Sequence, residues 1–274
     1  MDFNFRFFIR FLTKILYMSG FYNIMQAEGC MPHFFIEAKN VNNGKIVIFD
    51  AENYRHIAKS LRAKIGEKLL LIDENQVQYE TKIKNIDSKE IICEVVKSYP
   101  SIRDLDFDLY LAQSPLRSDA QLTIMEKSTE LGVRAVFPII TDNCALAESV
   151  LAKKHEKWQK VMYEASKQCE RAKIPTCFEP QKLSELLDSN NFDKILVLAE
   201  RSTEISLKEY LNKNRIKKGE KILVVIGPEG GFSQNEFEYF KSKNLPLITL
   251  GNLILKAETA VIATLGNIIY EYKR

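Results

Sequence analysis

The segment from Phe34 to about Pro100 has the hydrophobic pattern of short strands. Several segments alternate apolar and polar residues, which is typical of antiparallel strands that bury one face. We expect strands over residues 34–37, 45–49, 68–72, 77–83 and 91–96, and one helix over residues 53–62. Short strands separated by turn residues predict a small β-barrel, and residues 97–104 predict a linker after it.

From Leu105 onward the pattern changes to alternating strands and helices. We expect strands over residues 107–112, 135–140, 195–199, 222–226 and 247–250. Helices are expected from Ser118 to Gly132, over residues 149–172, from Ser233 onward and over residues 258–272. Ser118 with Gln121, and Ser233 with Glu236, have the spacing of capping boxes. This alternation favours an α/β domain in which helices cover a parallel sheet.

Composition narrows the class of protein without identifying it. Of the 274 residues, 46% are hydrophobic and 27% are charged, which is ordinary for a folded protein with a sizeable core. The formal charge of +3 does not by itself indicate a nucleic-acid binder. The five cysteines form no CxxC pair and histidine is scarce, so we expect free thiols, no metal site and a reducing, cytoplasmic environment.

Residues 1–30 have a different character from the rest. The run from Phe3 to Tyr17 is aromatic and apolar, but three basic residues interrupt it, so it falls short of the roughly 20 apolar residues of a membrane span. It also lacks the apolar core and cleavage site of a secretory signal. We expect an extension upstream of a functional start at Met31. The alternative is a basic amphipathic segment for a membrane surface or for targeting.

The most informative segment reads Val-Ile-Gly-Pro-Glu-Gly-Gly-Phe-Ser over residues 225–233. It leaves a buried strand and enters a capped helix, and ligands of open α/β sheets bind beyond the carboxyl ends of strands. Glycines there let the backbone approach a ligand closely. The segment lacks the P-loop and GxGxxG fingerprints, and Glu229 would repel phosphates. We therefore expect a cofactor without phosphates, bound by Gly227, Pro228, Glu229, Gly230 and Gly231. The alternative is a tight turn between a strand and a helix.

A second segment, residues 250–260, repeats this arrangement. Another strand ends at a glycine, and a short apolar loop leads into the last helix. Two such loops at one edge of a sheet would enclose an adenine between apolar surfaces. The further residues that we expect at the cofactor site are Leu198, Leu250, Gly251, Leu253, Leu255 and Ala260. Lys256 is the basic residue of this segment, and the alternative is an apolar connection with a solvated lysine.

Two further segments contain candidate polar residues. Lys127 and Glu130 have the spacing of an i, i+3 ion pair. Arg171 stands near the predicted end of the long helix, where it either complements the helix dipole or binds a phosphate or a uracil oxygen. Cys169 falls on the apolar face of that helix, which favours a core position over a nucleophile.

Taken together, these segments resemble the 16S ribosomal RNA uridine N3-methyltransferase family of the SPOUT class. The matching stretches follow one another as residues 31–35, 56–66, 126–133, 168–175, 227–232 and 250–260. The Gly-Pro-Glu-Gly-Gly loop with the Leu-Gly…Glu-Thr-Ala segment is specific within SPOUT proteins. The full set favours this family over relatives that modify tRNA.

The resemblance implies a PUA-like RNA-binding barrel over residues 31–100 and a SPOUT domain over residues 105–274 that ends in a deep trefoil knot. It implies S-adenosylmethionine as the cofactor, a homodimer with its site near the subunit interface, and no membrane. The implied substrate is uridine 1498 of 16S RNA in the small ribosomal subunit. Arg62, Arg117 and Lys127 would contact the RNA.

Two positions depart from the family pattern. The family usually has arginine at the position of Lys256, and lysine keeps the charge but loses the planar fork that binds oxygens bidentately. Residues 114–119 lack the usual Lys-Gly, so Arg117 would serve in place of that lysine.

The implied reaction transfers a methyl group from a sulfonium to uracil N3, which must lose its proton. Negative charge then spreads onto the flanking carbonyl oxygens, where fixed cations would stabilise it. Our hypothesis assigns this task to Arg171, together with Lys256 or the partner subunit's Arg62. Glu229 is well placed in the sequence as a base, and the alternative is that it only shapes the loop. The alternatives are a SPOUT methyltransferase for tRNA, a non-catalytic RNA-binding or ribosome assembly protein, and an α/β enzyme that uses NAD or a nucleotide.

Overall fold

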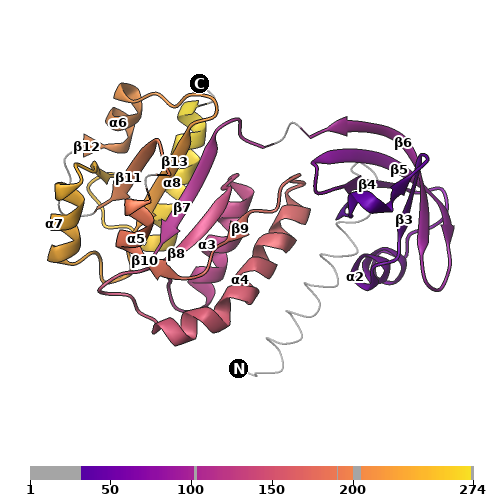
Figure 1. Cartoon of the computed structure of the whole chain (residues 1–274), viewed down its shortest axis with the longest axis horizontal. Helices are drawn as coiled ribbons and strands as arrows, with labels where there is room; N and C mark the ends of the chain where they lie inside the picture. Colours follow the sequence, from indigo (N-terminus) through magenta and orange to yellow (C-terminus); the bar gives the residue numbers. More distant parts are fainter. Residues whose placement is uncertain (1–31, 102–103, 190, 200–204, 273–274) are drawn as a thin grey trace, which may run out of the picture. The chain divides into compact units, whose positions relative to one another are not determined.

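The computed structural model divides the chain into two compact units between Ile102 and Arg103 (Figure 1). The structure describes residues 32–101, 104–189, 191–199 and 205–272. The division falls within the stretch that the sequence predicts as a linker. The predicted extension over residues 1–30 and the predicted start at Met31 lie outside the described residues.

The first unit contains a mainly antiparallel sheet of order β1-β4-β5-β6-β3-β2. The parallel pair is β1 with β4. Each predicted strand of this unit is present, but β5 and β6 extend further than expected because they pair along their whole length, with two register shifts. The strands are β1 (His33–Phe35), β2 (Val41–Asn42), β3 (Lys45–Ile48), β4 (Lys68–Ile72), β5 (Val77–Ile86) and β6 (Ile91–Pro100).

The helical part of this unit differs in detail from the prediction. After the 3-10 turn η1 (Ala38–Asn40), the helix α2 (Ala51–Tyr54) begins behind Asp50, whose carboxylate accepts a hydrogen bond from the backbone N–H of Asn53 at 2.8 Å. The chain continues as the π-helical segment η2 (Arg55–Ser60). Ile57 of this segment is fully buried in the core of the unit.

The second unit contains a sheet of order β10-β8-β7-β13-β11-β14-β12, with β9 paired to β8. Each strand pairing within its described residues is parallel. As a result, the carboxyl ends of β13, β11 and β14 lie side by side. The strands are β7 (Asp108–Gln113), β8 (Ala135–Ile140), β9 (Thr176–Cys177), β10 (Gln181–Lys182), β11 (Lys194–Leu198), β12 (Ile205–Ser206), β13 (Lys221–Ile226) and β14 (Leu247–Thr249).

Helices cover both faces of this sheet (Figure 1). Alternate residues of a strand point to opposite faces, so Val224 of β13 joins one core and Val225 joins the other. The first face carries α3 (Ser118–Glu130), α4 (Glu148–Gln168), α6 (Leu207–Lys213) and α8 (Ala257–Tyr272). The second face carries α5 (Leu183–Asp188) and α7 (Gln234–Ser242). The predicted α/β class is confirmed.

One predicted capping box and one predicted helix end are wrong. The helix α3 begins at Ser118, and its N-cap is Arg117, which makes no side-chain capping bond. Gln121 instead accepts a hydrogen bond from the backbone N–H of Leu116 at 2.7 Å. The helix α4 ends at Gln168 instead of residue 172, because Glu170 adopts a left-handed conformation with φ of 56°. The second capping box, Ser233 with Glu236, is confirmed at the start of α7.

Helices that combine enough length with enough apolar content to cross a membrane are absent from the part of the chain that the structure describes. The trefoil knot implied by the resemblance stays a prediction.

Candidate active site

A cavity of about 710 Å³ lies at the carboxyl ends of β11, β13 and β14 in the second unit. Its walls come from two loops, which we call the glycine loop (residues 227–233) and the apolar loop (residues 250–256). The strand order explains why these loops meet. β11 lies between β13 and β14, and its last residue, Leu198, pairs with both Ile226 and Ile248. The loops that follow β13 and β14 therefore start on either side of Leu198.

The glycine loop is a tight structure that leads from β13 into α7. The backbone N–H of Gly231 donates to the carbonyl of Pro228 at 2.9 Å, and Gly231 has a φ of 69°, which favours glycine. Gly227 lies against the ring of Phe232, so a Cβ at residue 227 would approach ring atoms to 3.1–3.3 Å. The capping box of Ser233 and Glu236 then fixes the start of α7. The loop conformation therefore depends on glycine at both positions.

The apolar loop is more open. The Thr249 hydroxyl donates to the carbonyl of Gly251 at 2.8 Å and accepts from its N–H at 3.1 Å. Gly251 has a φ of 142°, and a Cβ there would meet no atom within 4 Å. Leu253 and Ile254 are 83% and 62% exposed, which is unusual for large apolar side chains. This loop thus presents apolar surface to the solvent beside the cavity.

All the residues predicted for the cofactor site line this one cavity. They are Leu198, Gly227, Pro228, Glu229, Gly230, Gly231, Leu250, Gly251, Leu253, Leu255 and Ala260. Other lining residues were not predicted, including Ala199, Phe232, Phe237, Thr249 and Glu258. Phe232 and Glu258 lie within the two quoted segments and Thr249 directly precedes the second, so position in the motif alone did not mark them as lining residues. Phe237 projects from the first turns of α7, and its position depends on how that helix leaves the loop.

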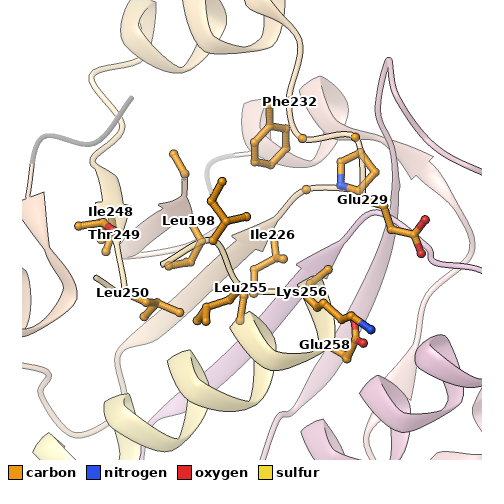
Figure 2. Close-up of a pocket in the computed structure, with 18 of the residues that line it drawn as sticks. Leu198, Ile226, Glu229, Phe232, Ile248, Thr249, Leu250, Leu255, Lys256 and Glu258 are labelled. Carbon is orange, nitrogen blue, oxygen red and sulfur yellow. The ribbon is translucent and has the colours of Figure 1, made fainter. Parts of the chain in front are cut away.

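The charged residues of the cavity gather on one side of it. Figure 2 shows Glu229, Lys256 and Glu258 on one side, with Ile248, Thr249 and Leu250 on the opposite side. Lys256 and Glu229 are exposed, whereas Glu258, in the first turn of α8, is half-buried. The cavity therefore combines an apolar end that suits a flat ring with a polar end that can handle charge or a proton.

Arg171, which was predicted to be catalytic, does not line this cavity. The side chain is 8% exposed, and its Nε donates to Asp104 at 2.8 Å. Its Nη1 donates to the carbonyls of Thr129 and Val133, each at 2.9 Å. Because α4 ends early, Arg171 turns inward and connects the end of α3 with the start of the second unit. These contacts indicate a structural role.

The residues predicted to bind RNA have different environments. Arg62, in the first unit, is exposed and has a φ of 53°. Arg117 is exposed at the start of α3, and the neighbouring Ala120 lines the cavity. Lys127 donates to Glu126 at 2.7 Å and to Glu130 at 2.8 Å, and these bonds raise its pKa. The ion pair considered as its alternative role is therefore present, and a contact of Lys127 with RNA stays a prediction.

Cys169 behaves as the sequence analysis expected of a core residue. It caps α4 and is partly buried. Burial raises the pKa of its thiol, which disfavours the thiolate that a nucleophile requires.

Family profiles match both units. One described as an RNA methyltransferase domain matches residues 103–269, and one described as an RNA methyltransferase PUA domain matches residues 49–96.

Individual relatives match most of the chain. It is 27% identical over 249 residues to the ribosomal RNA small subunit methyltransferase E of Bacillus subtilis, which covers 88% of this chain and 97% of that protein. It is 28% identical over 226 residues to the protein of the same name from Aquifex aeolicus, which covers 80% of this chain and 92% of that protein.

Solved structures share the fold. The crystal structure of ribosomal RNA small subunit methyltransferase E from Neisseria gonorrhoeae bound to S-adenosyl methionine superposes with a TM-score of 0.76. The two chains are 24% identical, and the match covers 88% of this chain and 97% of that one.

Proposed function

Since the chain belongs to the RNA methyltransferase family, we propose that its cavity binds S-adenosylmethionine and that it methylates N3 of uridine 1498 in 16S ribosomal RNA. The observation that carries this proposal is the convergence of the glycine and apolar loops. Two loops that are separated by sixteen residues of sequence line one cavity, and every residue predicted for the cofactor site is among the lining residues.

The residues of the cavity suit this cofactor. Leu198, Leu250 and Leu255 offer apolar surface for an adenine ring, and the backbone groups of both loops offer hydrogen bonds to its edge. Phe232 packs so closely on Gly227 that a side chain at residue 227 would have to displace the ring. The carboxylate of Glu229 disfavours phosphates but is compatible with a cofactor that carries positive charge.

When bound, S-adenosylmethionine supplies a methyl group on a positively charged sulfur. The task left to the protein is to make uracil N3 nucleophilic. Lys256 is the cation of the cavity wall. We assign to it the stabilisation of the negative charge that spreads onto a uracil carbonyl oxygen as N3 loses its proton. Glu229 and Glu258 are the carboxylates that line the cavity, so each is a candidate to accept that proton.

The proposed substrate rests on the names of the relatives and on the domain composition. The Bacillus subtilis and Aquifex aeolicus proteins are named for methylation of small-subunit ribosomal RNA. The PUA match in the first unit indicates a separate RNA-binding element. Arg62 and Arg117 are exposed cations that we assign to phosphate contacts. A uracil must leave its stack before its N3 can enter a cavity of this kind.

We also propose that the protein acts as a homodimer. Leu253 and Ile254 beside the cavity, together with Ile262 and Tyr270 on α8, are exposed large apolar side chains within the second unit. A second copy that covered them would shield the cavity from water. Sedimentation at micromolar concentration tests this part, since a monomeric mass would contradict it.

The central experiment uses small ribosomal subunits from cells that lack this protein. Purified protein and cofactor with a labelled methyl group should place the label on N3 of uridine 1498, as mapped by mass spectrometry of RNA fragments. Label on tRNA in a parallel reaction, with none on the subunits, would favour another RNA methyltransferase activity. Calorimetry that detected no cofactor binding would refute the enzymatic proposal and favour an RNA-binding or assembly role.

A further inference from the structure

A turn between β8 and α4, residues 141–144, packs against the glycine loop. None of its four residues is among those that line the cavity, so it contacts the loop from outside. The N–H of Cys144 donates to the carbonyl of Thr141 at 3.0 Å, which closes the turn. The hydroxyls of Thr141 and Ser114 form a buried hydrogen bond of 2.7 Å, and the N–H of Ser114 donates to the carbonyl of Ile226 at 3.1 Å. The base of the turn is thereby fixed to the end of β13.

The tip of the turn bonds directly to the glycine loop. The Nδ2 of Asn143 donates to the carbonyl of Gly231 at 3.1 Å and more weakly to that of Gly230 at 3.5 Å. The carboxylate of Asp142 accepts a hydrogen bond from the Ser233 hydroxyl. The backbone N–H of Asp142 donates to the carboxylate of Glu236 at 3.1 Å. The turn therefore contacts both the last residues of the loop and the capping box that follows.

These contacts reach residues at the wall of the cavity. The carbonyl of Gly231 belongs to the peptide that leads into Phe232, so its direction sets where the Phe232 ring lies. That ring lines the cavity, covers Gly227 and rests edge-on against Phe240, with centroids 5.0 Å apart. Asn143 also approaches the loop backbone closely, because a Cβ at Gly230 would lie 3.3 Å from the Cβ of Asn143.

We propose that Asn143 is a positioning residue, whose side-chain amide holds the glycine loop in the conformation that binds S-adenosylmethionine. This inference rests on the proposed function. The role depends on the amide as a donor, because both of its partners are carbonyl oxygens. A carboxylate of the same size would place an acceptor against two acceptors and would push the loop away.

The test compares Asn143→Asp, which keeps the shape but removes the donor, with Asn143→Ala. Asn214 provides the matched control, since its Nδ2 also donates to a backbone carbonyl, that of Tyr210 at 3.0 Å, and it does not line the cavity. Calorimetry should show cofactor binding weakened about fivefold in Asn143→Ala and about tenfold in Asn143→Asp. The KM for the cofactor should rise in proportion, whereas kcat at saturating cofactor and the unfolding temperature should change little. Asn143→Ser, which keeps a donor, should recover part of the affinity.

Two outcomes would overturn the inference alone. Asn143→Asp with the cofactor affinity of the wild type would show that the donor is not needed. Equal losses in Asn143→Asp and Asn214→Asp would show a general effect on the fold. A wild-type protein that did not bind the cofactor would instead refute the proposed function, and the inference would fall with it.

Discussion

The glycine loop and the apolar loop line the same cavity but are built in opposite ways. The glycine loop is closed by its own turn, capped by Ser233 and Glu236, and bonded from outside by Asp142 and Asn143. The apolar loop contains a local hydrogen-bonded turn at Thr249 and Gly251 but leaves Leu253 and Ile254 exposed. One wall is therefore preformed, whereas the other has freedom to adapt.

This difference suggests a division of labour. A preformed wall loses little conformational entropy when a ligand binds, so it suits the cofactor that every reaction cycle uses. The apolar loop offers Leu250 and Leu255 to the adenine, but its exposed part and Lys256 also suit a large substrate that arrives and leaves.

The largest effect is expected outside both loops, at Arg171. Arg171→Ala leaves the Asp104 carboxylate without its ion pair and removes the donor to the carbonyls of Thr129 and Val133. We expect the free energy of unfolding to fall by about 3 kcal/mol, as measured by urea denaturation. Cofactor binding and turnover should then be lost together, at the lower urea concentration at which the second unit of the variant unfolds.

A surface ion pair provides the control for Arg171. Arg134 lies 2.8 Å from Asp108, but its side chain is 42% exposed. Arg134→Ala should therefore lower stability by less than about 1 kcal/mol. If Arg171→Ala kept full stability but lost turnover, the catalytic role first predicted for Arg171 would be restored.

The second effect is expected in the apolar loop. Lys256→Ala removes the cation of the cavity wall, and we expect kcat to fall about thirtyfold, because charge that develops on the substrate loses its stabilising partner. Cofactor affinity should remain within about twofold by calorimetry. Lys256→Arg should keep most of the activity, and Lys208→Ala, at an exposed lysine on α6, should change nothing. A loss of cofactor binding in Lys256→Ala would contradict the division between the two walls.

The third effect is expected in the glycine loop. Gly227→Ala places a Cβ against the Phe232 ring, which Phe240 and Phe237 hold from behind. We expect cofactor affinity to fall about tenfold by calorimetry, because overpacking of this kind costs about 1–3 kcal/mol. The matched control is Gly266→Ala in α8, where an added Cβ meets no atom within 4 Å. Unchanged affinity in Gly227→Ala would mean that this wall is not preformed.

The smallest effect is expected at the exposed part of the apolar loop. Leu253→Ala and Ile254→Ala each remove a side chain that is mostly in solvent, so cofactor affinity should change less than about threefold. Leu255→Ala, at a half-buried residue of the same cavity, should have a larger effect on the same calorimetric measurement. A tenfold loss at Leu253 would place the apolar loop in the same preformed class as the glycine loop.

Much of the fold and of the cavity could be predicted from the sequence because both depend on local patterns. The strands β4 and β8 have the predicted bounds, since each is a continuous apolar run. The strands β9, β10 and β12 were not predicted, because two residues show no periodicity. The residues predicted for the cavity were found because strand ends and glycines mark them along the chain.

The roles of Arg171 and Asn143 could not be predicted in the same way. Residues 169–172 continue the apolar periodicity of a helix, but the left-handed Glu170 ends it and turns Arg171 toward carbonyls from α3 and the following loop. Asn143 gains its partners from a loop almost ninety residues later, and nothing in the adjacent sequence indicates that contact. Lys127 is a further case, because a lysine at this position is compatible both with an ion pair and with RNA binding. The ion pairs with Glu126 and Glu130 become visible only in the structure.

The pairing of β7 with β13 also has a consequence for how the protein is made. Asp108 pairs with Lys221, so the middle of the second sheet cannot assemble until the ribosome has released a segment near the end of the chain. The strands of the first unit all lie within residues 33–100 and can pair while synthesis continues. We expect the first unit to fold early and the second to fold slowly afterwards, with its apolar strands exposed to chaperones in the interval.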